Sequence, residues 1–347
     1  MLKPESAEVI VVGGGLAGLS AAIYLGRAKR PTLVIDAGKS MARWEPDVQN
    51  FLGFPNGISG TELIKRARKQ ARLYGVRFRR DQISRARVRK DRFSLRGSQT
   101  FYTCQQLLLA TGIFHLPPEI PGVKACLGHS LFFCKDCDGY RLQGQRIAIY
   151  GWTGEAVEYA LAMLVYSDQV VIVTDGRVRR WSAQSARWIR EYQIPVYQEP
   201  VKRLRRKGSQ ILALEFENGR KLPLEALFTT RGDIYFNDLA KSLGAKVNAN
   251  GEVVVDLEMQ TTVAGLYAAG CVTPANCQMI IAAGQGAVAA QAINRDLFRQ
   301  SRGRHSLRRF RRRQLRNRKT PILVSAPPDY GSKAPTAFSS KTLCLSL

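Results

Sequence analysis

Apolar and polar positions along the chain predict two units in which a strand, a turn and a helix follow one another. The apolar residues 9–12 predict a buried strand, and apolar positions at helical spacing follow over residues 19–28. The stretch IAIYGWTGEAVEYALAML, residues 147–164, has the same order. Further apolar runs predict strands within residues 31–36 and 170–176. Such units indicate an α/β protein that binds a nucleotide.

Length and hydrophobicity indicate how many domains the chain can form and whether it can span a membrane. With 347 residues, 45% of them hydrophobic, the chain can bury about two domain cores. No apolar run approaches the roughly 18 residues that a membrane span requires. The first residues run almost directly into a strand, without the layout of a signal peptide. We therefore expect a cytoplasmic protein with no membrane partner.

The net charge of +26 is extreme and is spread over the whole chain. Residues 299–347 hold 13 basic residues against one acid, which leaves a net charge of +14 on residues 1–298. Between Lys65 and Arg96 there are 14 basic residues and two acids. Such a field attracts acidic proteins, nucleic acid or anionic membranes. The alternative is a solvated surface that favours solubility.

The first chemical signal is a glycine-rich turn. Gly13, Gly15 and Gly18 follow a predicted strand and open a predicted helix, and Asp36 ends the next strand about 20 residues on. Glycines let the backbone approach a pyrophosphate at the helix N-terminus, and the acid can accept hydrogen bonds from ribose hydroxyls. This context predicts a bound dinucleotide, against the alternative of a glycine turn without a ligand.

The second signal is FFCKDCDGY, in which Cys134 and Cys137 are separated by two residues. One thiolate of such a pair can attack a disulfide while the other resolves the mixed intermediate. Asp138 is placed to give a proton to a departing thiol or to take one from an attacking thiol. Zinc is a weaker alternative because a structural site needs four ligands and no second Cys-x-x-Cys or close histidine pair is present. A merely buried pair is also possible, although its neighbours are polar.

On these and other motifs the chain resembles the low-molecular-weight thioredoxin reductases over roughly residues 6–298. The matching stretches are VVGGGLAGLSAAIYLGRA, NFLGFPNGISGTELI, LLLATG, CKDCDG, AVEYALAML and TTVAGLYAAG with QMIIAAGQGAVAAQAI. The resemblance implies two Rossmann-like, three-layer nucleotide-binding domains of the α/β class, the second inserted in the first, and a homodimer. It also implies a rotation that presents the dithiol alternately to the flavin and to the partner. The implied parts are an FAD domain at 1–115 and 230–298, a dithiol domain at 116–229, and a basic helix with a flexible tail at 299–347.

The resemblance also implies the residues that bind FAD. Gln278 and a helix that begins at Met279 would lie beside the flavin pyrimidine ring, where a helix N-terminus stabilises the charge of the reduced ring. The full set implied for FAD is Gly13, Gly15, Leu16, Ala17, Gly18, Asp36, Asn50, Ala110, Thr111, Gly112, Gly270, Cys271, Gln278 and Met279.

The chain departs from the family where a nicotinamide dinucleotide would bind. The family's G-G-G-x-S-A turn is replaced by residues 151–156, GWTGEA, in which Thr153 adds bulk and Glu155 adds a charge that repels pyrophosphate. The family's His-Arg-Arg clamp is replaced by residues 174–176, TDG. Asp175 could serve NADH instead of NADPH, but the altered turn argues against any nicotinamide binding.

Two more departures concern the flavin. The acid of the family's AAGD is Cys271 here, and the arginine before Gln278 is Cys277, so two charged hydrogen bonds to FAD are lost. The tail beyond residue 299 could compensate. It is expected to begin with a basic helix and to continue as a flexible end that carries aromatic residues able to stack on the flavin. The basic helix has apolar positions at Leu307, Phe310 and Leu315, and Tyr330 or Phe338 of the flexible end could stack on the flavin. A disordered tail is the alternative.

Intact FAD motifs, an intact Cys-x-x-Cys and lost nicotinamide motifs resemble a deeply rooted cyanobacterial branch of thioredoxin reductase-like flavoproteins. The expected function is electron transfer from flavin through Cys134 and Cys137 to a thioredoxin-like protein. An acidic protein of the ferredoxin type is the expected donor, because it fits both the altered turn and the basic surface.

Two alternative functions stay open. One is a dithiol oxidase that passes electrons from substrate thiols to oxygen. The other is a flavin redox sensor whose arginine-rich tail binds nucleic acid or an acidic partner. Both alternatives are less favoured than a disulfide reductase, and so is nucleic acid as a partner. The reason is that a Cys-x-x-Cys pair followed by Asp138 is typical of a catalytic site.

Overall fold

The computed structural model describes residues 4–89, 92–98 and 100–303. The chain divides into two compact units, Met1–Asp296 and Leu297–Leu347. No helix among the described residues is long and apolar enough to cross a membrane. The expected tail features lie outside the described residues: Leu307, Phe310, Leu315, Tyr330 and Phe338.

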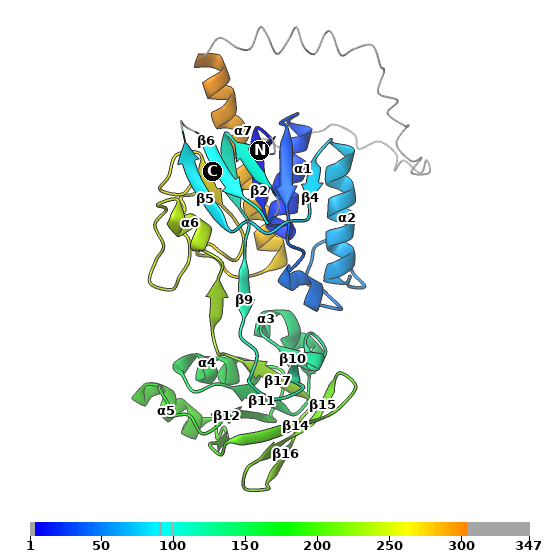
Figure 1. The fold of residues 1–347 in the computed structure, drawn as a ribbon. Helices are drawn as coiled ribbons and strands as arrows, with labels where there is room; N and C mark the ends of the chain where they lie inside the picture. Colours follow the sequence, from blue (N-terminus) through cyan, green and yellow to red (C-terminus); the bar gives the residue numbers. More distant parts are fainter. Residues whose placement is uncertain (1–3, 90–91, 99, 304–347) are drawn as a thin grey trace, which may run out of the picture. The chain divides into compact units, whose positions relative to one another are not determined.

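A parallel sheet of five strands forms around the first predicted strand-turn-helix unit (Figure 1). Its order is β19-β8-β2-β3-β4, and every neighbouring pair is parallel. The strands are β2 (Val9–Val12), β3 (Thr32–Ile35), β4 (Arg77–Arg79), β8 (Gln106–Leu109) and β19 (Leu266–Ala268). All residues of β2, β3 and β8 are buried. Continuous apolar runs of this kind are typical of parallel sheets that are covered on both faces.

A smaller sheet in the order β1-β7-β6-β5 covers one face of this parallel sheet. Leu95 and Tyr102 of the smaller sheet share a buried core with Ile10, Leu33 and Leu107 of the parallel sheet. The strands are β1 (Glu5–Ser6), β5 (Arg85–Arg89), β6 (Arg92–Arg96) and β7 (Phe101–Cys104). The helices of this part are α1 (Leu16–Arg27), η1 (Met41–Trp44), α2 (Gly60–Leu73), α6 (Asp238–Ser242) and α7 (Met279–Gly303).

A second parallel sheet, in the order β10-β17-β11-β12-β13, contains the second predicted unit. Along β11 the side chains alternate: Ile147 and Ile149 pack with α4, and Ala148 and Tyr150 pack with the antiparallel sheet β14-β15-β16. The strands are β10 (Leu131–Phe132), β11 (Ile147–Tyr150), β12 (Val170–Val173), β13 (Val196–Tyr197), β14 (Val201–Lys207), β15 (Gln210–Phe216), β16 (Lys221–Pro223) and β17 (Ala226–Thr229). The helices are η2 (Val123–Cys126), α3 (Lys135–Asp138), η3 (Gly139–Leu142), α4 (Gly154–Met163) and α5 (Ala183–Glu191).

An antiparallel strand pair joins the two parallel sheets (Figure 1). The chain leaves the first sheet through β9 (Ile113–His115) and returns through β18 (Asp233–Tyr235), so the second sheet is inserted between β8 and β19 of the first. The predicted α/β class with Rossmann-like parallel sheets is confirmed, as is the helix start at residue 279. A helix also follows β11, in the predicted order. The domain boundaries at residues 115, 229 and 298 stay a prediction.

Candidate active site

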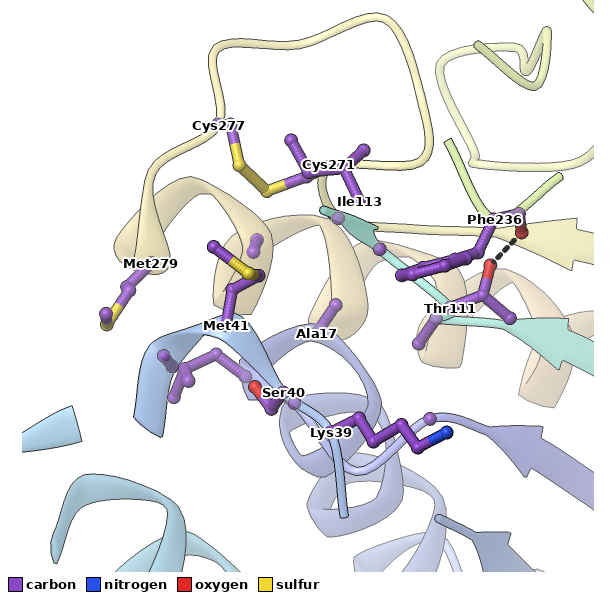
Figure 2. A pocket seen from close by; sticks show the side chains of 18 of the residues that line it. Ala17, Lys39, Ser40, Met41, Thr111, Ile113, Phe236, Cys271, Cys277 and Met279 are labelled. Carbon is purple, nitrogen blue, oxygen red and sulfur yellow. Dashed lines mark hydrogen bonds between the residues drawn. A yellow bond between two sulfur atoms is a disulfide. The ribbon is translucent and has the colours of Figure 1, made fainter. Parts of the chain in front are cut away.

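A cavity of about 570 Å³ brings together nearly all the residues that the sequence singled out (Figure 2). It extends from the glycine turn after β2 to the cysteine pair at α3. The predicted residues that line it are Gly13, Gly15, Leu16, Ala17, Asp36, Asn50, Ala110, Thr111, Gly112, Cys134, Cys137, Asp138, Gly270, Cys271, Gln278 and Met279. Gly18 lies behind this lining, in contact with the backbone of the turn.

The glycine turn is packed so closely that side chains do not fit. Gly13 has φ +113°, and a Cβ atom there would lie 2.1 Å from the carbonyl oxygen of Ala110. A Cβ atom on Gly18 would lie 2.0 Å from the carbonyl oxygen of Gly13. The carboxylate of Asp36 is buried, accepts a hydrogen bond from the backbone N–H of Gly38 at 3.0 Å and pairs with Arg68 at 3.3 Å. A bare backbone turn at a helix N-terminus beside a fixed carboxylate fits the pyrophosphate and ribose of a dinucleotide such as FAD.

Several cavity residues were not predicted from the sequence. Ser40 and Met41 line the wall where η1 begins, and Phe236 follows β18 and accepts a hydrogen bond from Thr111 Oγ1 through its backbone oxygen at 2.7 Å. Figure 2 shows these side chains around the cavity. Phe236 reaches the cavity only because β18 pairs with β9, and neither short strand carries a sequence signal of this pairing.

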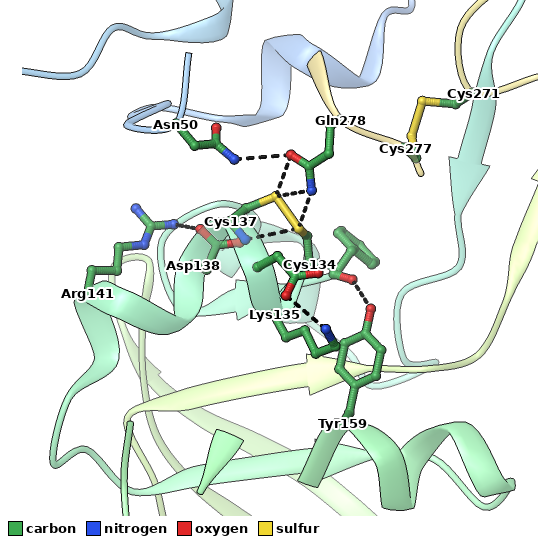
Figure 3. Close-up of a disulfide and its surroundings, with 12 residues drawn as sticks. Asn50, Cys134, Lys135, Cys137, Asp138, Arg141, Tyr159, Cys271, Cys277 and Gln278 are labelled. Atoms are coloured by element: carbon green, nitrogen blue, oxygen red, sulfur yellow. Dashed lines mark hydrogen bonds and ion pairs between the residues drawn. A yellow bond between two sulfur atoms is a disulfide. The ribbon is translucent and has the colours of Figure 1, made fainter. Parts of the chain in front are cut away.

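Cys134 and Cys137 form a disulfide at α3, and Gln278 holds it at the cavity (Figure 3). The side-chain N–H groups of Gln278 point to both sulfur atoms, with Nε2 at 3.2 Å from Cys134 Sγ and 3.3 Å from Cys137 Sγ. Asn50 donates to Oε1 of the same glutamine at 3.0 Å. The backbone N–H of Cys137 also donates to Cys134 Sγ at 3.1 Å, a contact that would stabilise a thiolate there.

Asp138 is buried, although the sequence suggested a polar turn. Only 5% of its surface is exposed, and its carboxylate is paired with Arg141. Desolvation is the largest cause that raises the pKa of Asp138; Arg141 opposes it, Glu45 adds to it, and the net result is a pKa of about 7. A carboxyl group with this pKa can both give and take a proton near neutral pH.

The second pair, Cys271 and Cys277, is also a disulfide, which corrects the interpretation from the sequence. The sequence alone predicted two separate losses of charged hydrogen bonds at these positions. The backbone turn between β19 and α7 brings both side chains to the cavity wall (Figure 2), and they pair across five intervening residues. The only sequence signal was the presence of two cysteines on the same loop, which does not by itself predict pairing.

The turn after β11 differs from the glycine turn after β2. The ring of Trp152 lies under the guanidinium group of Arg177, and the backbone N–H of Arg180 donates to the carbonyl oxygen of Trp152 at 2.6 Å. Thr153 also forms a β-bridge with Arg180. Asp175 accepts hydrogen bonds from the backbone N–H of Val201 and from the hydroxyl group of Tyr150. The segment after β12 therefore packs on this turn. Asp175, the acid that could have bound a ribose, is already hydrogen-bonded within the protein.

Comparisons with known proteins show the family of the chain. The chain matches the family of pyridine nucleotide-disulphide oxidoreductases over residues 7–291. Thioredoxin reductase of Treponema pallidum is 31% identical over 294 residues, which cover 82% of this chain and 95% of that protein. NADPH-dependent thioredoxin reductase 3 of Arabidopsis thaliana is 29% identical over 310 residues, which cover 84% of this chain and 58% of that protein. The solved structure of TrxB from Bacillus anthracis gives a TM-score of 0.78 at 27% identity and covers 85% of this chain and 99% of that one.

The chain belongs to the pyridine nucleotide-disulphide oxidoreductase family. Within that family it is an oxidoreductase of the thioredoxin reductase type, and its cofactor is FAD. Cys134 and Cys137 are its redox-active disulfide pair.

Proposed function

We propose that the protein reduces a disulfide of a thioredoxin-like protein with electrons from an acidic, ferredoxin-type donor instead of NADPH. The observation that carries the choice of donor is the closed turn after β11. In that turn Thr153 and Trp152 replace glycines, and Arg180 is hydrogen-bonded to the backbone where a phosphate would approach. Glu155 adds a carboxylate at the first turn of α4, which repels an anion at the helix N-terminus.

The basic surface supports a protein donor. Five arginines of the hairpin β5 and β6 project from one face, and we call them the arginine ladder: Arg85, Arg87, Arg89, Arg92 and Arg96. Arg85 stands directly opposite Arg96, and like charges in this position destabilise a sheet. The residues immediately before β5, from Asp81 to Ser84, line the cavity. An acidic partner on the ladder would therefore relieve the repulsion and lie beside one end of the cavity.

The cysteine chemistry follows from the contacts at α3. FAD, when bound, would supply the electron pair for reduction of the disulfide. As the Cys134–Cys137 bond opens, Cys134 departs as a thiol with a proton from Asp138. Cys134, whose thiolate is stabilised by the backbone N–H of Cys137, then attacks one sulfur of the partner disulfide. Cys137 attacks the mixed disulfide, which restores the Cys134–Cys137 bond and releases the partner as a dithiol. The partner gains two electrons and two protons in this cycle.

Five finer points belong to the same proposal. We propose that the cavity residues that the sequence assigned to FAD hold that cofactor, and that the domain boundaries lie at residues 115, 229 and 298. The protein works as a homodimer in the cytoplasm. Its place is in the cyanobacterial branch that lacks nicotinamide motifs.

The test is anaerobic reduction of the purified flavoprotein, followed at the flavin absorption band, with NADPH, NADH, reduced ferredoxin and dithiothreitol as separate reductants. We expect fast reduction by ferredoxin, which slows as salt screens the ladder over a Debye length of about 8 Å. Fast reduction by either nucleotide would overturn the proposed donor. Rapid oxygen consumption with a dithiol, without reduction of thioredoxin, would instead favour a dithiol oxidase.

A charge reversal gives the matched control for docking. Arg85→Glu with Arg87→Glu should lower the rate of reduction by ferredoxin at least about tenfold at low salt. Arg187→Glu with Arg190→Glu changes the net charge equally on α5, where both side chains are also exposed, and should have a smaller effect. Equal effects of the two pairs would contradict a docking site on the ladder.

A further inference from the structure

The four cysteines that form disulfides among the described residues all line one cavity. Cys134 and Cys137 lie at α3, and Cys271 and Cys277 lie on the loop between β19 and α7. Cys277 directly precedes Gln278, whose amide group contacts both sulfur atoms of the first pair. Figure 3 shows both disulfides beside Gln278. We propose that Cys271–Cys277 is a second redox-active disulfide, which is reduced by the dithiol of Cys134 and Cys137.

The free cysteines of the described part provide a contrast. Cys104 and Cys126 are buried and do not line the cavity. Burial raises the pKa of Cys104 to about 12 and also raises that of Cys126, so both stay protonated and unreactive. Cys277 is exposed, and Cys271 is only half buried. A thiolate can therefore approach Cys277 without unfolding of the chain.

Hydrogen bonds hold the part of the loop that carries Cys271, in addition to the disulfide. The backbone N–H and the hydroxyl group of Thr273 both donate to the carbonyl oxygen of Gly270, at 2.9 and 2.8 Å. Gln285 accepts from the backbone N–H of Gly270 at 2.8 Å, and Val253 donates to the carbonyl oxygen of Val272 at 2.8 Å. Because these bonds fix the segment that carries Cys271, this segment can stay in place when the disulfide opens.

The exchange of electrons between the two cysteine pairs needs no other oxidant or reductant. The Cys134 thiolate attacks Cys277 Sγ, the Cys271–Cys277 bond breaks, and Cys271 leaves as a thiolate that takes a proton. Cys137 then attacks Cys134 in the mixed disulfide and releases Cys277 as a thiol. The first pair is oxidised and the second is reduced by the same two electrons. The protein could thus hold a reduced dithiol at the exposed Cys277 while the first pair is reduced again.

A reductive titration tests this inference independently of the proposed donor. The FAD-loaded protein is titrated anaerobically with dithionite, quenched with acid, alkylated with N-ethylmaleimide and digested for mass spectrometry. We expect uptake of about three two-electron equivalents per chain, with label on Cys271 and Cys277 as well as on the first pair. Uptake of about two equivalents, with Cys271 and Cys277 labelled only after denaturation, would overturn the proposal. The control Cys271→Asp with Cys277→Arg should take up about two.

Two further variants test the route between the pairs. In Cys134→Ala with Cys137→Ala, dithionite should reduce the second pair at least about tenfold more slowly, and an unchanged rate would overturn the relay. In Cys137→Ser with Cys271→Ser, mild oxidation should join Cys134 to Cys277, detected as a crosslinked peptide. A yield no higher than that of a bond from Cys134 to the buried Cys126 would also overturn it. Dithionite replaces the physiological donor, so reduction by NADPH would refute the proposed donor and leave this inference intact.

Discussion

Asp138 lies against Arg141 in a buried ion pair, yet the pKa of its carboxyl group is raised to about 7. The removal of water from the carboxylate is the largest cause, and the nearby carboxyl group of Glu45 adds to it. Arg141 opposes the shift but does not cancel it. The group is therefore about half protonated at neutral pH, beside a disulfide whose opening needs a proton and whose closing releases one.

We predict opposite pH dependences for the two half-reactions. Reduction of the Cys134–Cys137 disulfide needs the protonated acid, so its single-turnover rate should fall as pH rises through about 7. Attack of Cys134 on the partner needs the carboxylate, so that rate should rise through the same pH. Asp138→Asn should remove both inflections and slow both steps by about 100-fold. Stopped-flow measurement of each step between about pH 5 and 9 gives the profiles.

Asp136→Asn is the control, because Asp136 is exposed and pairs with the neighbouring Lys135. It should leave both profiles unchanged.

Stability gives a second measurement of the same group. A carboxyl group whose folded pKa exceeds its usual value of 3.8 binds more protons in the folded state than in the unfolded state between about pH 4 and 7. Its contribution to the free energy of unfolding therefore falls as pH rises through that range, and Asp138→Asn should abolish this trend. An unchanged inflection in the variant would show that another group titrates.

The turn after β2 has no room for a Cβ atom at Gly13, whereas the turn after β11 has room at Gly154. This difference predicts how much flavin two alanine variants retain. Gly13→Ala places a Cβ atom 2.1 Å from the carbonyl oxygen of Ala110 in a residue with φ +113°, so the turn must move. We expect at least about a tenfold loss of FAD affinity, measured as bound flavin per chain after dialysis. Gly154→Ala is the matched control in the other turn, since nothing lies within 4 Å of its Cβ position. Full retention of FAD in the Gly13 variant would contradict a pyrophosphate at this turn.

The parallel sheets could be predicted because continuous apolar strands and glycine turns are local signals. β2 and β11 are fully buried and lie within the predicted units, α4 follows β11 in the predicted order, and α7 begins at the predicted residue. The pairing of β9 with β18 could not be predicted, because these strands are three residues long and lie over a hundred residues apart in the chain.

The site was predictable only in part, for a similar reason. Glycines and a Cys-x-x-Cys pair carry their chemistry in adjacent residues, and the structure brings these to one cavity. Pairing of Cys271 with Cys277 depends on the path of the loop between them, which the residues in between do not specify. The raised pKa of Asp138 depends on its burial and on the distant Glu45, with Arg141 opposing the shift, and no local sequence pattern predicts this balance.

The order of the first cysteine pair gives a spectroscopic prediction. If Cys137 faces the flavin and Cys134 faces the partner, Cys134→Ser should leave a Cys137 thiolate that gives a charge-transfer band with oxidised flavin. Cys137→Ser should give no such band, because Cys134 is the outer thiol. The absorbance above the main flavin band, recorded as a function of pH, distinguishes the two variants. The reverse pattern would refute the assigned order.

The closed turn after β11 gives a prediction by restoration. Trp152→Gly, Thr153→Gly and Glu155→Ser remove the ring that Arg177 covers, the bulk at the helix start and the repelling carboxylate. With Thr174→His, Asp175→Arg and Gly176→Arg added, we expect measurable NADPH binding by calorimetry at millimolar nucleotide. The replacement of Asp175 also frees Tyr150 and the backbone N–H of Val201, so the folded state of the variant should be checked by circular dichroism.

Trp152→Phe is the control for this restoration, because it keeps an aromatic ring beneath Arg177 and leaves Thr153 and Glu155 in place. It should bind no nucleotide. If the restored variant is folded and still fails to bind NADPH, the altered turn is not the cause of the loss. In that case the segment after β12, which Arg180 joins to the carbonyl oxygen of Trp152, becomes the remaining barrier. Arg180→Pro removes the donor N–H of that bond and should then restore binding if the segment alone closes the turn.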